Sequence, residues 1–199
     1  MLTLTPRVHS ALELSARLHK EQVRKDILKT PYFTHLVGVM LLLNEGEADE
    51  DTLIAGLFHD SIEDVAGYTY EKLKEDCGVE VANIVLGVTE IREVSIVEDR
   101  TLRWLTNKEN YLNNLRSSSD KSVLVSTADK THNLITLMGN YKLEGDEFLK
   151  HFSSMKNTLW FNDEVEKIVM ERLDNENTLV KKFKATLAEA HTVFKEYEK

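Results

Sequence analysis

LFHDSIEDV (residues 57–65) places several ionisable side chains in the middle of an apolar part of the chain. The flanking segments DTLIAGLF and VAGYTYEKL show no strand-like alternation and no turn signal before Gly67. The pattern therefore predicts a helix that begins near Asp51 and carries this polar set through its middle. The ionisable members of the set are His59, Asp60, Glu63 and Asp64.

A helix would bring these four side chains onto one face. Residues four positions apart share a helix face, so His59 pairs with Glu63, and Asp60 with Asp64. An imidazole and three carboxylates that are partly removed from water need a cation or a hydrogen-bonded network. Oxygen and imidazole ligands suit Mn, Fe, Zn or Mg. The preceding run LIAGLF argues against a purely solvated acidic face, and this stretch alone leaves a metal site and a structural charge network both open.

Length and composition predict one helical domain. The chain has 199 residues, 42% of them hydrophobic, which is enough to bury a single core. Only two prolines and eight glycines interrupt a sequence rich in Leu, Glu, Lys and Ala, and this favours helices. The longest apolar run, Val39–Leu43, is too short to span a membrane. A single cysteine excludes an intrachain disulfide, and the first residues lack a signal-peptide pattern, so we expect a cytoplasmic protein.

Helical periodicity continues along the chain, with Pro, Gly and Asn marking the breaks. We expect helices at about 7–28, 35–43, 51 onward, 69–78, 79–91, 101–116 and 120–139, a cap at Asp120, a loop at 92–100, and two or three more helices within 146–199. No repeat, low-complexity tract or long linker divides the sequence. The prediction is a single all-α domain over residues 1–199, with a C-terminal helical extension from about 146.

The formal net charge of −9 is unevenly distributed. Residues 1–30 hold six Lys and Arg against three Asp and Glu, whereas residues 44–100 hold four against sixteen. The acidic total argues against binding to nucleic acid or to an anionic membrane. The basic first segment could still hold a small anion, although composition alone favours an ordinary solvated surface there.

Two residues outside the opening stretch favour the metal site. His35 lies at the apolar start of a predicted helix, where a lone histidine is usually a packed core residue. Asp129 follows an apolar run in VLVSTADKTHNL (residues 123–134), and a buried aspartate needs a cap or a cation. The order His35, His59–Asp60, Asp129 resembles HD-domain phosphohydrolases, in which two histidines and two aspartates from separate helices hold one divalent metal ion.

The resemblance narrows to the hydrolase half of RelA/SpoT-type alarmone enzymes, and especially to the small alarmone hydrolases. It is carried by VRKDILKTPYFTH (23–35), by the segment from LFHD to VTE (57–90) and by STADKTHNL (126–134), and it extends over about residues 7–140. In this family Gly often precedes the TPY stretch, and Pro follows the first metal-binding histidine. Here Lys29 or Thr30 and Leu36 occupy these places. Such departures affect packing around the pocket and not the ligands.

The resemblance implies an HD-domain helical bundle with a metal centre and an acid pair. The implied metal ligands are His35, His59, Asp60 and Asp129, which would hold one divalent ion per chain, with Mn²⁺ expected. Glu63 and Asp64 would activate the attacking water and protonate the leaving oxygen, or else support the metal histidines. Which of the two is the acid and which the base stays open. His132 is expected to be structural and not a ligand.

Basic, aromatic and amide side chains at matching positions would bind an anionic substrate. Arg24 and Lys25, at the end of the predicted first helix, would contact phosphate, and Tyr32 would lie beside the nucleotide. Lys108 would reach the pyrophosphate group, and Asn133 would bind ribose or phosphate. The alternatives are a solvated helix end for the basic pair, core packing for Tyr32, and a surface or capping role for Asn133.

The resemblance therefore implies a metal-dependent pyrophosphohydrolase that removes the 3′-diphosphate of (p)ppGpp to give GDP or GTP and pyrophosphate. Its partner would be a small anionic nucleotide, with no nucleic acid or membrane involved. One alternative is an HD phosphohydrolase for another nucleotide or phosphoester. A second is a non-catalytic, metal-stabilised nucleotide-binding module, against which the retained acid pair argues. The sequence gives no indication of oligomeric state.

Overall fold

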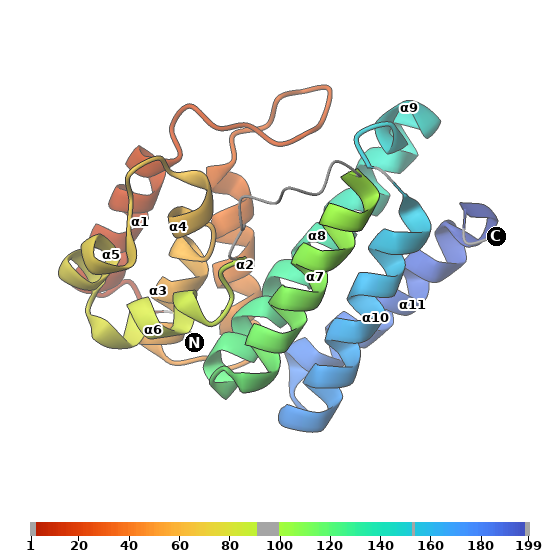
Figure 1. Cartoon of the computed structure of the whole chain (residues 1–199). Helices are drawn as coiled ribbons and strands as arrows, with labels where there is room; N and C mark the ends of the chain where they lie inside the picture. Colours follow the sequence, from red (N-terminus) through yellow and green to blue (C-terminus); the bar gives the residue numbers. More distant parts are fainter. Residues whose placement is uncertain (1–2, 91–99, 153, 198–199) are drawn as a thin grey trace.

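The chain folds into helices, as the sequence predicts. This computed structural model describes residues 3–90, 100–152 and 154–197, and the regular secondary structure within these ranges is helical apart from one isolated bridge between Val23 and Pro31. The helices are α1 Pro6–Leu18, α2 Phe33–Glu45, α3 Glu50–Phe58, α4 Ser61–Asp64, α5 Tyr70–Cys77, α6 Val79–Leu86, α7 Arg100–Ser117, α8 Asp120–Glu144, α9 Asp146–Leu149, α10 Met155–Arg172 and α11 Thr178–Val193, followed by a 3₁₀ turn at Lys195–Tyr197 (Figure 1).

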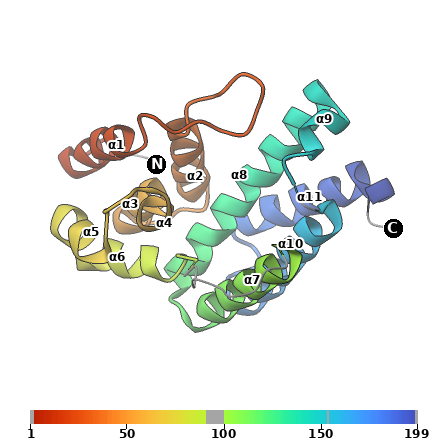
Figure 2. The same cartoon turned by 45° about the horizontal axis from the view of Figure 1, so that its top comes forward.

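Helix α8 lies at the centre of the arrangement. It packs against α2 and α3 and also against α10 and α11, and it crosses between the N-terminal helices and the C-terminal group in Figure 2. Clear end signals set its length: the Ser119 hydroxyl accepts the backbone N–H of Ser122 at 3.1 Å, and Gly145 ends the helix with a φ of 62°. The predicted cap at Asp120 is therefore wrong, because Ser119 makes the capping bond.

The apolar core brings three helix segments to one point. Leu36 of α2, Phe58 of α3 and Leu134 of α8 are all buried in the same core cluster. Burial of such side chains contributes about 1.5–3 kcal/mol each relative to exposure. The packing places the first turn of α2, the end of α3 and the middle of α8 together, and these are the places where His35, His59 and Asp129 occur.

The predicted first helix ends ten residues early. Helix α1 stops at Leu18, and the chain then forms a non-helical hairpin up to α2. Within it the backbone N–H of Arg24 donates to the carbonyl of Thr30 at 2.8 Å, and Lys29 adopts a left-handed φ of 54°. These turn contacts replace helical ones, so Arg24 and Lys25 lie in a loop and not at a helix end.

The opening stretch is not one continuous helix. Helix α3 ends at Phe58, His59 and Asp60 form a turn, and α4 begins at Ser61. The Ser61 hydroxyl donates to the carbonyl of Phe58 at 2.7 Å, which satisfies one of the carbonyls left free at the end of α3. The prediction that His59 and Glu63 share one helix face is thus wrong, because His59 lies in the turn and Glu63 lies in α4.

The remaining boundaries follow the sequence pattern with small differences. Helix α6 ends at Leu86 and not near residue 91, and the predicted loop at 92–100 falls outside the described residues except for Arg100, which begins α7. Helices α9, α10 and α11 fill the predicted C-terminal extension. Among the helices of the described ranges, none combines the length and apolar character that crossing a membrane requires.

Candidate metal centre and pocket

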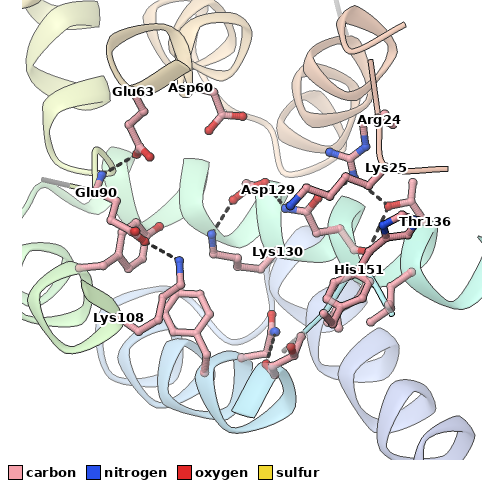
Figure 3. Close-up of a pocket in the computed structure, with 18 of the residues that line it drawn as sticks. Arg24, Lys25, Asp60, Glu63, Glu90, Lys108, Asp129, Lys130, Thr136 and His151 are labelled. Atoms are coloured by element: carbon pink, nitrogen blue, oxygen red, sulfur yellow. Dashed lines mark hydrogen bonds and ion pairs between the residues drawn. The ribbon is translucent and has the colours of Figure 1, made fainter. Parts of the chain in front are cut away.

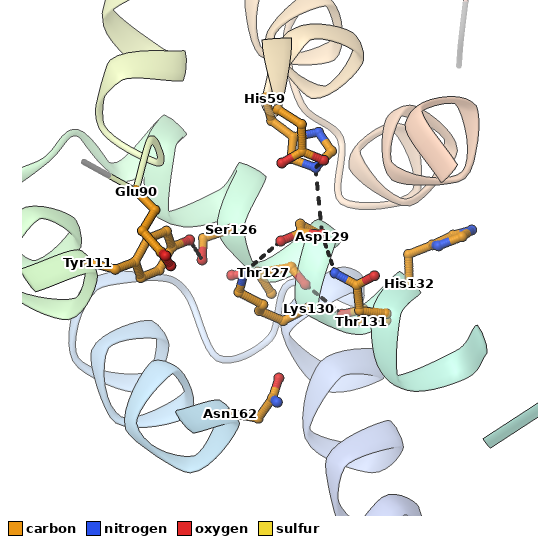
Figure 4. Close-up of polar contacts among 12 residues, drawn as sticks. His59, Glu90, Tyr111, Ser126, Thr127, Asp129, Lys130, Thr131, His132 and Asn162 are labelled. Atoms are coloured by element: carbon orange, nitrogen blue, oxygen red, sulfur yellow. Dashed lines mark hydrogen bonds and ion pairs between the residues drawn. The ribbon is translucent and has the colours of Figure 1, made fainter. Parts of the chain in front are cut away.

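Two histidines and two aspartates from three segments converge at the middle of α8. Ligand atoms of His35, His59 and Asp129 all lie within 4.8 Å of one another, and the three residues are buried. The Oδ2 atom of Asp60 lies 3.0 Å from His59 Nε2 and 3.8 Å from His35 Nε2. Figure 4 shows His59 above Asp129 at this point. The structure therefore brings together all four predicted ligands.

The geometry of this cluster fits a divalent cation. His59 Nδ1 lies 2.9 Å from the carbonyl of Gly56 and donates to it, so in the neutral ring, the form that binds a metal, Nε2 carries the lone pair. That Nε2 atom faces His35 Nε2 at 3.2 Å, and Asp129 Oδ1 lies 3.2 Å from His35 Nε2 and 3.6 Å from His59 Nε2. Ligand atoms that each lie about 2.0–2.2 Å from one ion are separated from each other by roughly 3–4 Å. Two imidazoles and two carboxylates at this spacing suit a transition-metal ion.

Charge interactions in the cluster keep both carboxyl groups ionised. Burial opposes ionisation of Asp129, but Lys130 and His35 hold the pKa of that carboxyl well below its usual range. Burial acts in the same direction on Asp60, and His59 overcomes it to lower the pKa of this carboxyl too. For His59, burial favours the neutral ring, whereas Asp60 and Asp129 raise its pKa well above the ordinary value. The site is thus an anionic one that accepts positive charge.

Lys130 is a residue of the candidate site that the sequence interpretation missed. Its Nζ lies 2.6 Å from Asp129 Oδ2 and 4.9 Å from the centre of the Tyr111 ring, and the side chain is 14% exposed. Burial disfavours its charge, but Asp129 raises the pKa, so the ammonium persists. Lys130 therefore holds one carboxylate oxygen while the other faces the histidines. The sequence does show a Lys directly after the candidate ligand Asp129 in STADK. Its pairing with one particular oxygen of Asp129 depends on the fold.

A series of contacts between charged side chains runs along one wall of the pocket, from Glu63 through Glu90 to Lys108 (Figure 3). Glu63 Oε1 accepts the backbone N–H of Glu90 at 2.5 Å, and the Glu90 carboxylate is paired with Lys108 Nζ. Lys108 lies over the Phe161 ring at 4.9 Å. The structure thus brings Glu63 and Lys108 together through Glu90. Glu90 could not be identified from the sequence, because it is one of many acidic residues in this region and belongs to no motif.

The hairpin before α2 carries the predicted phosphate and nucleotide contacts to the opposite wall. Arg24 donates to Asn133 Oδ1 at 2.8 Å and to Thr136 Oγ1 at 3.1 Å, and its guanidinium lies 5.6 Å from the centre of the Tyr32 ring. Asn133 in turn donates to Asp129 Oδ1 at 2.5 Å, and the Tyr32 hydroxyl donates to Asp60. Tyr32 and Asn133 therefore bond directly to the candidate metal ligands Asp60 and Asp129, and Arg24 is linked to Asp129 through Asn133.

A cavity of about 930 Å³ joins these walls. Its lining includes every predicted site residue except the buried His35: Arg24, Lys25, Tyr32, His59, Asp60, Glu63, Asp64, Lys108, Asp129 and Asn133. Further lining residues come from α9, from the segment that follows it and from α10, which the sequence interpretation did not assign to the site: Phe148, Lys150, His151, Phe152, Thr158, Phe161 and Asn162. The volume is large enough for a nucleotide.

His132 is placed beside the metal centre but points away from it. Its Nδ1 lies 2.9 Å from His35 Nδ1, and burial, aided by His35, lowers the pKa of His132 to about 4. A neutral His132 accepts the Nδ1–H of His35 and so fixes the ring whose Nε2 faces the cluster. The geometry agrees with the structural role expected from the sequence.

This chain belongs to the HD domain family, whose pattern matches residues 11–157. The Xenopus tropicalis protein MESH1, named guanosine-3′,5′-bis(diphosphate) 3′-pyrophosphohydrolase, is 37% identical over 126 residues, which is 62% of this chain and 65% of that protein. A guanosine-3′,5′-bis(diphosphate) 3′-pyrophosphohydrolase of Haemophilus influenzae is 36% identical over 113 residues, or 54% of this chain and 15% of that much longer protein. The predicted resemblance to alarmone hydrolases is thereby confirmed.

The fold is shared with solved structures. A metazoan orthologue of SpoT that hydrolyses ppGpp superposes with a TM-score of 0.74 at 23% identity, covering 95% of this chain and 98% of that one. A protein of Listeria monocytogenes gives a TM-score of 0.66 at 22% identity, covering 81% and 99%. In sequence, the match to this chain spans just under two thirds of the Xenopus protein. In structure, the helical architecture of the metazoan SpoT orthologue matches 95% of this chain.

Proposed function

We propose that this protein is a metal-dependent pyrophosphohydrolase that removes the 3′-diphosphate of (p)ppGpp. The observation that carries the proposal is the buried His and Asp cluster at the wall of a cavity with basic side chains on two sides. The similarity to proteins named for this activity supports the choice of substrate. In the reaction, water adds to the phosphorus attached to the ribose 3′-oxygen, the P–O3′ bond breaks, and the 3′-oxygen takes up a proton.

One divalent ion, which we expect to be Mn²⁺, would be held by His35, His59, Asp60 and Asp129. Such an ion supplies a polarised water and offsets negative charge as it develops on phosphate oxygens. The protein's own contribution is to fix the ligand atoms: Lys130 holds the outer oxygen of Asp129, and the carbonyl of Gly56 orients the His59 ring.

Glu63 and Asp64 are proposed to move the protons. Both line the cavity beside Asp60, and Glu63 is fixed by the backbone N–H of Glu90. One of the two would orient or deprotonate the water, and the other would protonate the leaving 3′-oxygen. Two neighbouring carboxylates in different surroundings take on different pKa values, which is what an acid and a base require.

We propose that basic side chains on both walls of the cavity bind the negatively charged phosphate groups of the substrate. Arg24 and Lys25 would bind phosphate from the hairpin, and Lys108 would bind the diphosphate from α7. Tyr32 and Asn133 would contact the nucleoside. These basic groups offset the repulsion that an acidic chain of net charge −9 would otherwise exert on an anionic nucleotide.

We further propose that residues 1–199 act as one domain and that the reaction takes place in the cytoplasm. Helices α10 and α11 pack on α8, and α10 lines the cavity, so the C-terminal extension contributes to the same site. The single cysteine and the nucleotide substrate are consistent with a reducing compartment.

A substrate panel tests the proposal. The purified chain would be assayed with Mn²⁺ against ppGpp, pppGpp, GTP, a nucleoside monophosphate and a chromogenic phosphodiester, and pyrophosphate and phosphate would be measured separately. The proposal expects the highest kcat/KM for ppGpp or pppGpp with release of pyrophosphate. A higher value for a monophosphate or for the phosphodiester would establish a different HD phosphohydrolase. Nucleotide binding without any turnover would establish a non-catalytic module.

A further inference from the structure

His19 is a buried histidine that does not line the cavity and that no step of the proposed reaction uses. It follows the last residue of α1 and is 1% exposed. Its Nδ1 lies 2.5 Å from Gln22 Oε1, whereas its Nε2 has no hydrogen-bond partner among the described residues. A buried polar atom without a partner lowers stability. Packing alone would favour an apolar side chain at this position, so the imidazole needs another explanation.

Two consecutive hydrogen bonds fix a proton on Nδ1 of His19. The Gln22 side chain donates from Nε2 to the backbone carbonyl of Asp64 at 2.6 Å. Because a carbonyl oxygen only accepts, the amide nitrogen of Gln22 faces Asp64 and its amide oxygen faces His19. His19 therefore donates from Nδ1 to that oxygen. These bonds connect the end of α1 to the backbone of Asp64, which is one of the two candidate acids and the last residue of α4.

The ring of His19 supports the metal cluster by a separate contact. It stacks on the ring of Tyr32, with the ring centres 5.5 Å apart and the planes inclined by 21°. The Tyr32 hydroxyl donates to the carboxylate of Asp60, a candidate metal ligand. The stacked imidazole restricts the tilt of the Tyr32 ring and so keeps its hydroxyl against Asp60. One buried side chain thus supports two different groups of the site, one with its N–H and one with its ring face.

We propose that His19 is a positioning residue that orients Asp60 through Tyr32 and Asp64 through Gln22. This inference rests on the proposed function only for the roles of Asp60 and Asp64, a metal ligand and an acid or base. An imidazole suits the position because it offers a flat ring and an N–H donor at once. A phenylalanine would offer only the ring, and an asparagine only the donor.

These two substitutions separate the two connections. His19→Phe keeps a ring that stacks on Tyr32 but loses the N–H donor. His19→Asn keeps a donor to Gln22, because its Nδ2 takes the place of Nδ1, but loses the ring. Calorimetric Mn²⁺ titration of the full chain reports on Asp60. Hydrogen exchange of the amides of Asp64 and Val65, which bond within α4, reports on the backbone that Gln22 holds.

Each variant should affect one measurement and not the other. His19→Asn should weaken Mn²⁺ binding roughly 3- to 10-fold, less than loss of a direct partner of a ligand, and should leave exchange in α4 unchanged. His19→Phe should keep Mn²⁺ affinity, speed exchange in α4 by roughly 3- to 10-fold, the value of one hydrogen bond, and lower kcat for ppGpp by a similar factor. A purely structural role would change both measurements together in both variants.

Gln22→Leu tests the connection to Asp64 without changing the buried position. Gln22 is half-buried, and the leucine removes both of its side-chain hydrogen bonds. This variant should reproduce the effects of His19→Phe, and combining the two substitutions should add nothing further. If His19→Phe does not fold, Gln22→Leu decides the same point.

His9 provides the matched control, because it is an exposed histidine of the same helix, paired with Glu13. His9→Phe and His9→Asn should match the wild type in both measurements, and circular dichroism would verify the helices of all variants. Wild-type Mn²⁺ affinity in His19→Asn, wild-type exchange in His19→Phe and Gln22→Leu, or loss of both properties in any folded variant would overturn the inference. The expected separation in a protein that does not hydrolyse ppGpp would leave it standing and overturn only the proposed function.

Discussion

Gly38 of α2 lies directly against the imidazole of His132 on α8. A Cβ atom added at Gly38 would stand 2.2 Å from His132 Nε2 and Cδ2, closer than any real contact allows. Because His132 Nδ1 in turn lies 2.9 Å from His35 Nδ1, the close approach of the two helices is coupled to the orientation of a candidate metal ligand.

The first prediction follows from this contact. Gly38→Ala should destabilise the protein by about 1–3 kcal/mol through overpacking and, by displacing His132, should lower Mn²⁺ affinity roughly 10- to 100-fold. Thermal unfolding of the metal-free protein and a calorimetric Mn²⁺ titration measure the two effects. Gly139→Ala is the control, because its Cβ meets nothing within 4 Å and helix propensity alone should stabilise α8 by about 0.5–1 kcal/mol. If both variants bind Mn²⁺ like the wild type, His132 does not position His35.

The second prediction concerns metal content. Purified protein should contain about one divalent ion per chain, and Asp60→Ala and Asp129→Ala should lose it, because each removes one of the two ligand carboxylates. Elemental analysis after desalting measures this. Asp120→Ala serves as the control, since Asp120 lies on the same helix as Asp129 but pairs with Arg172 at the surface. Full metal occupancy in both site variants would show that the ion is held elsewhere.

The third prediction separates proton transfer from metal binding. Glu63→Gln should retain the bond from the Glu90 N–H while losing its charge, and Asp64→Asn is the matching change at the second acid. Each should keep its metal and its helices yet lower kcat for ppGpp by ~10²-fold or more, the usual scale for a positioned acid or base. Loss of metal instead of rate in either variant would assign that residue to ligand support.

The fourth prediction addresses substrate affinity. Arg24→Ala should mainly raise KM for ppGpp, by the roughly 1.5–3 kcal/mol of a charge-assisted hydrogen bond, and should affect a simple phosphodiester much less. Steady-state kinetics with both substrates measure the difference, with metal content checked in parallel. Arg17→Ala, which removes an exposed arginine of α1 paired with Glu13, should leave both substrates unaffected. Equal losses on the two substrates would show that Arg24 supports the metal site through Asn133 and does not recognise the nucleotide.

The sequence predicts the helical class and the convergence of the four candidate ligands because each ligand adjoins an apolar segment. His35 begins one such segment, His59 ends another and Asp129 follows a third. The structure buries these segments in one core and brings His35, His59 and Asp129 together beside it.

Other features depend on contacts between distant residues and could not be predicted in this way. The early end of α1 accompanies the stacking of His19 on Tyr32, with ring centres 5.5 Å apart, and the break after Phe58 depends on where the Ser61 hydroxyl points. Asn162 has no motif around it, and only the packing of α10 against α8 makes it part of the cavity.

The most direct test of the proposed function is ppGpp hydrolysis in ¹⁸O-labelled water with and without Mn²⁺, followed by mass analysis of the products. The proposed mechanism predicts GDP and pyrophosphate in equal amounts, only when metal is present, with the label in pyrophosphate because water attacks phosphorus and the P–O3′ bond breaks. Absence of turnover by the metal-loaded protein, or label in the 3′-hydroxyl of GDP, would contradict it.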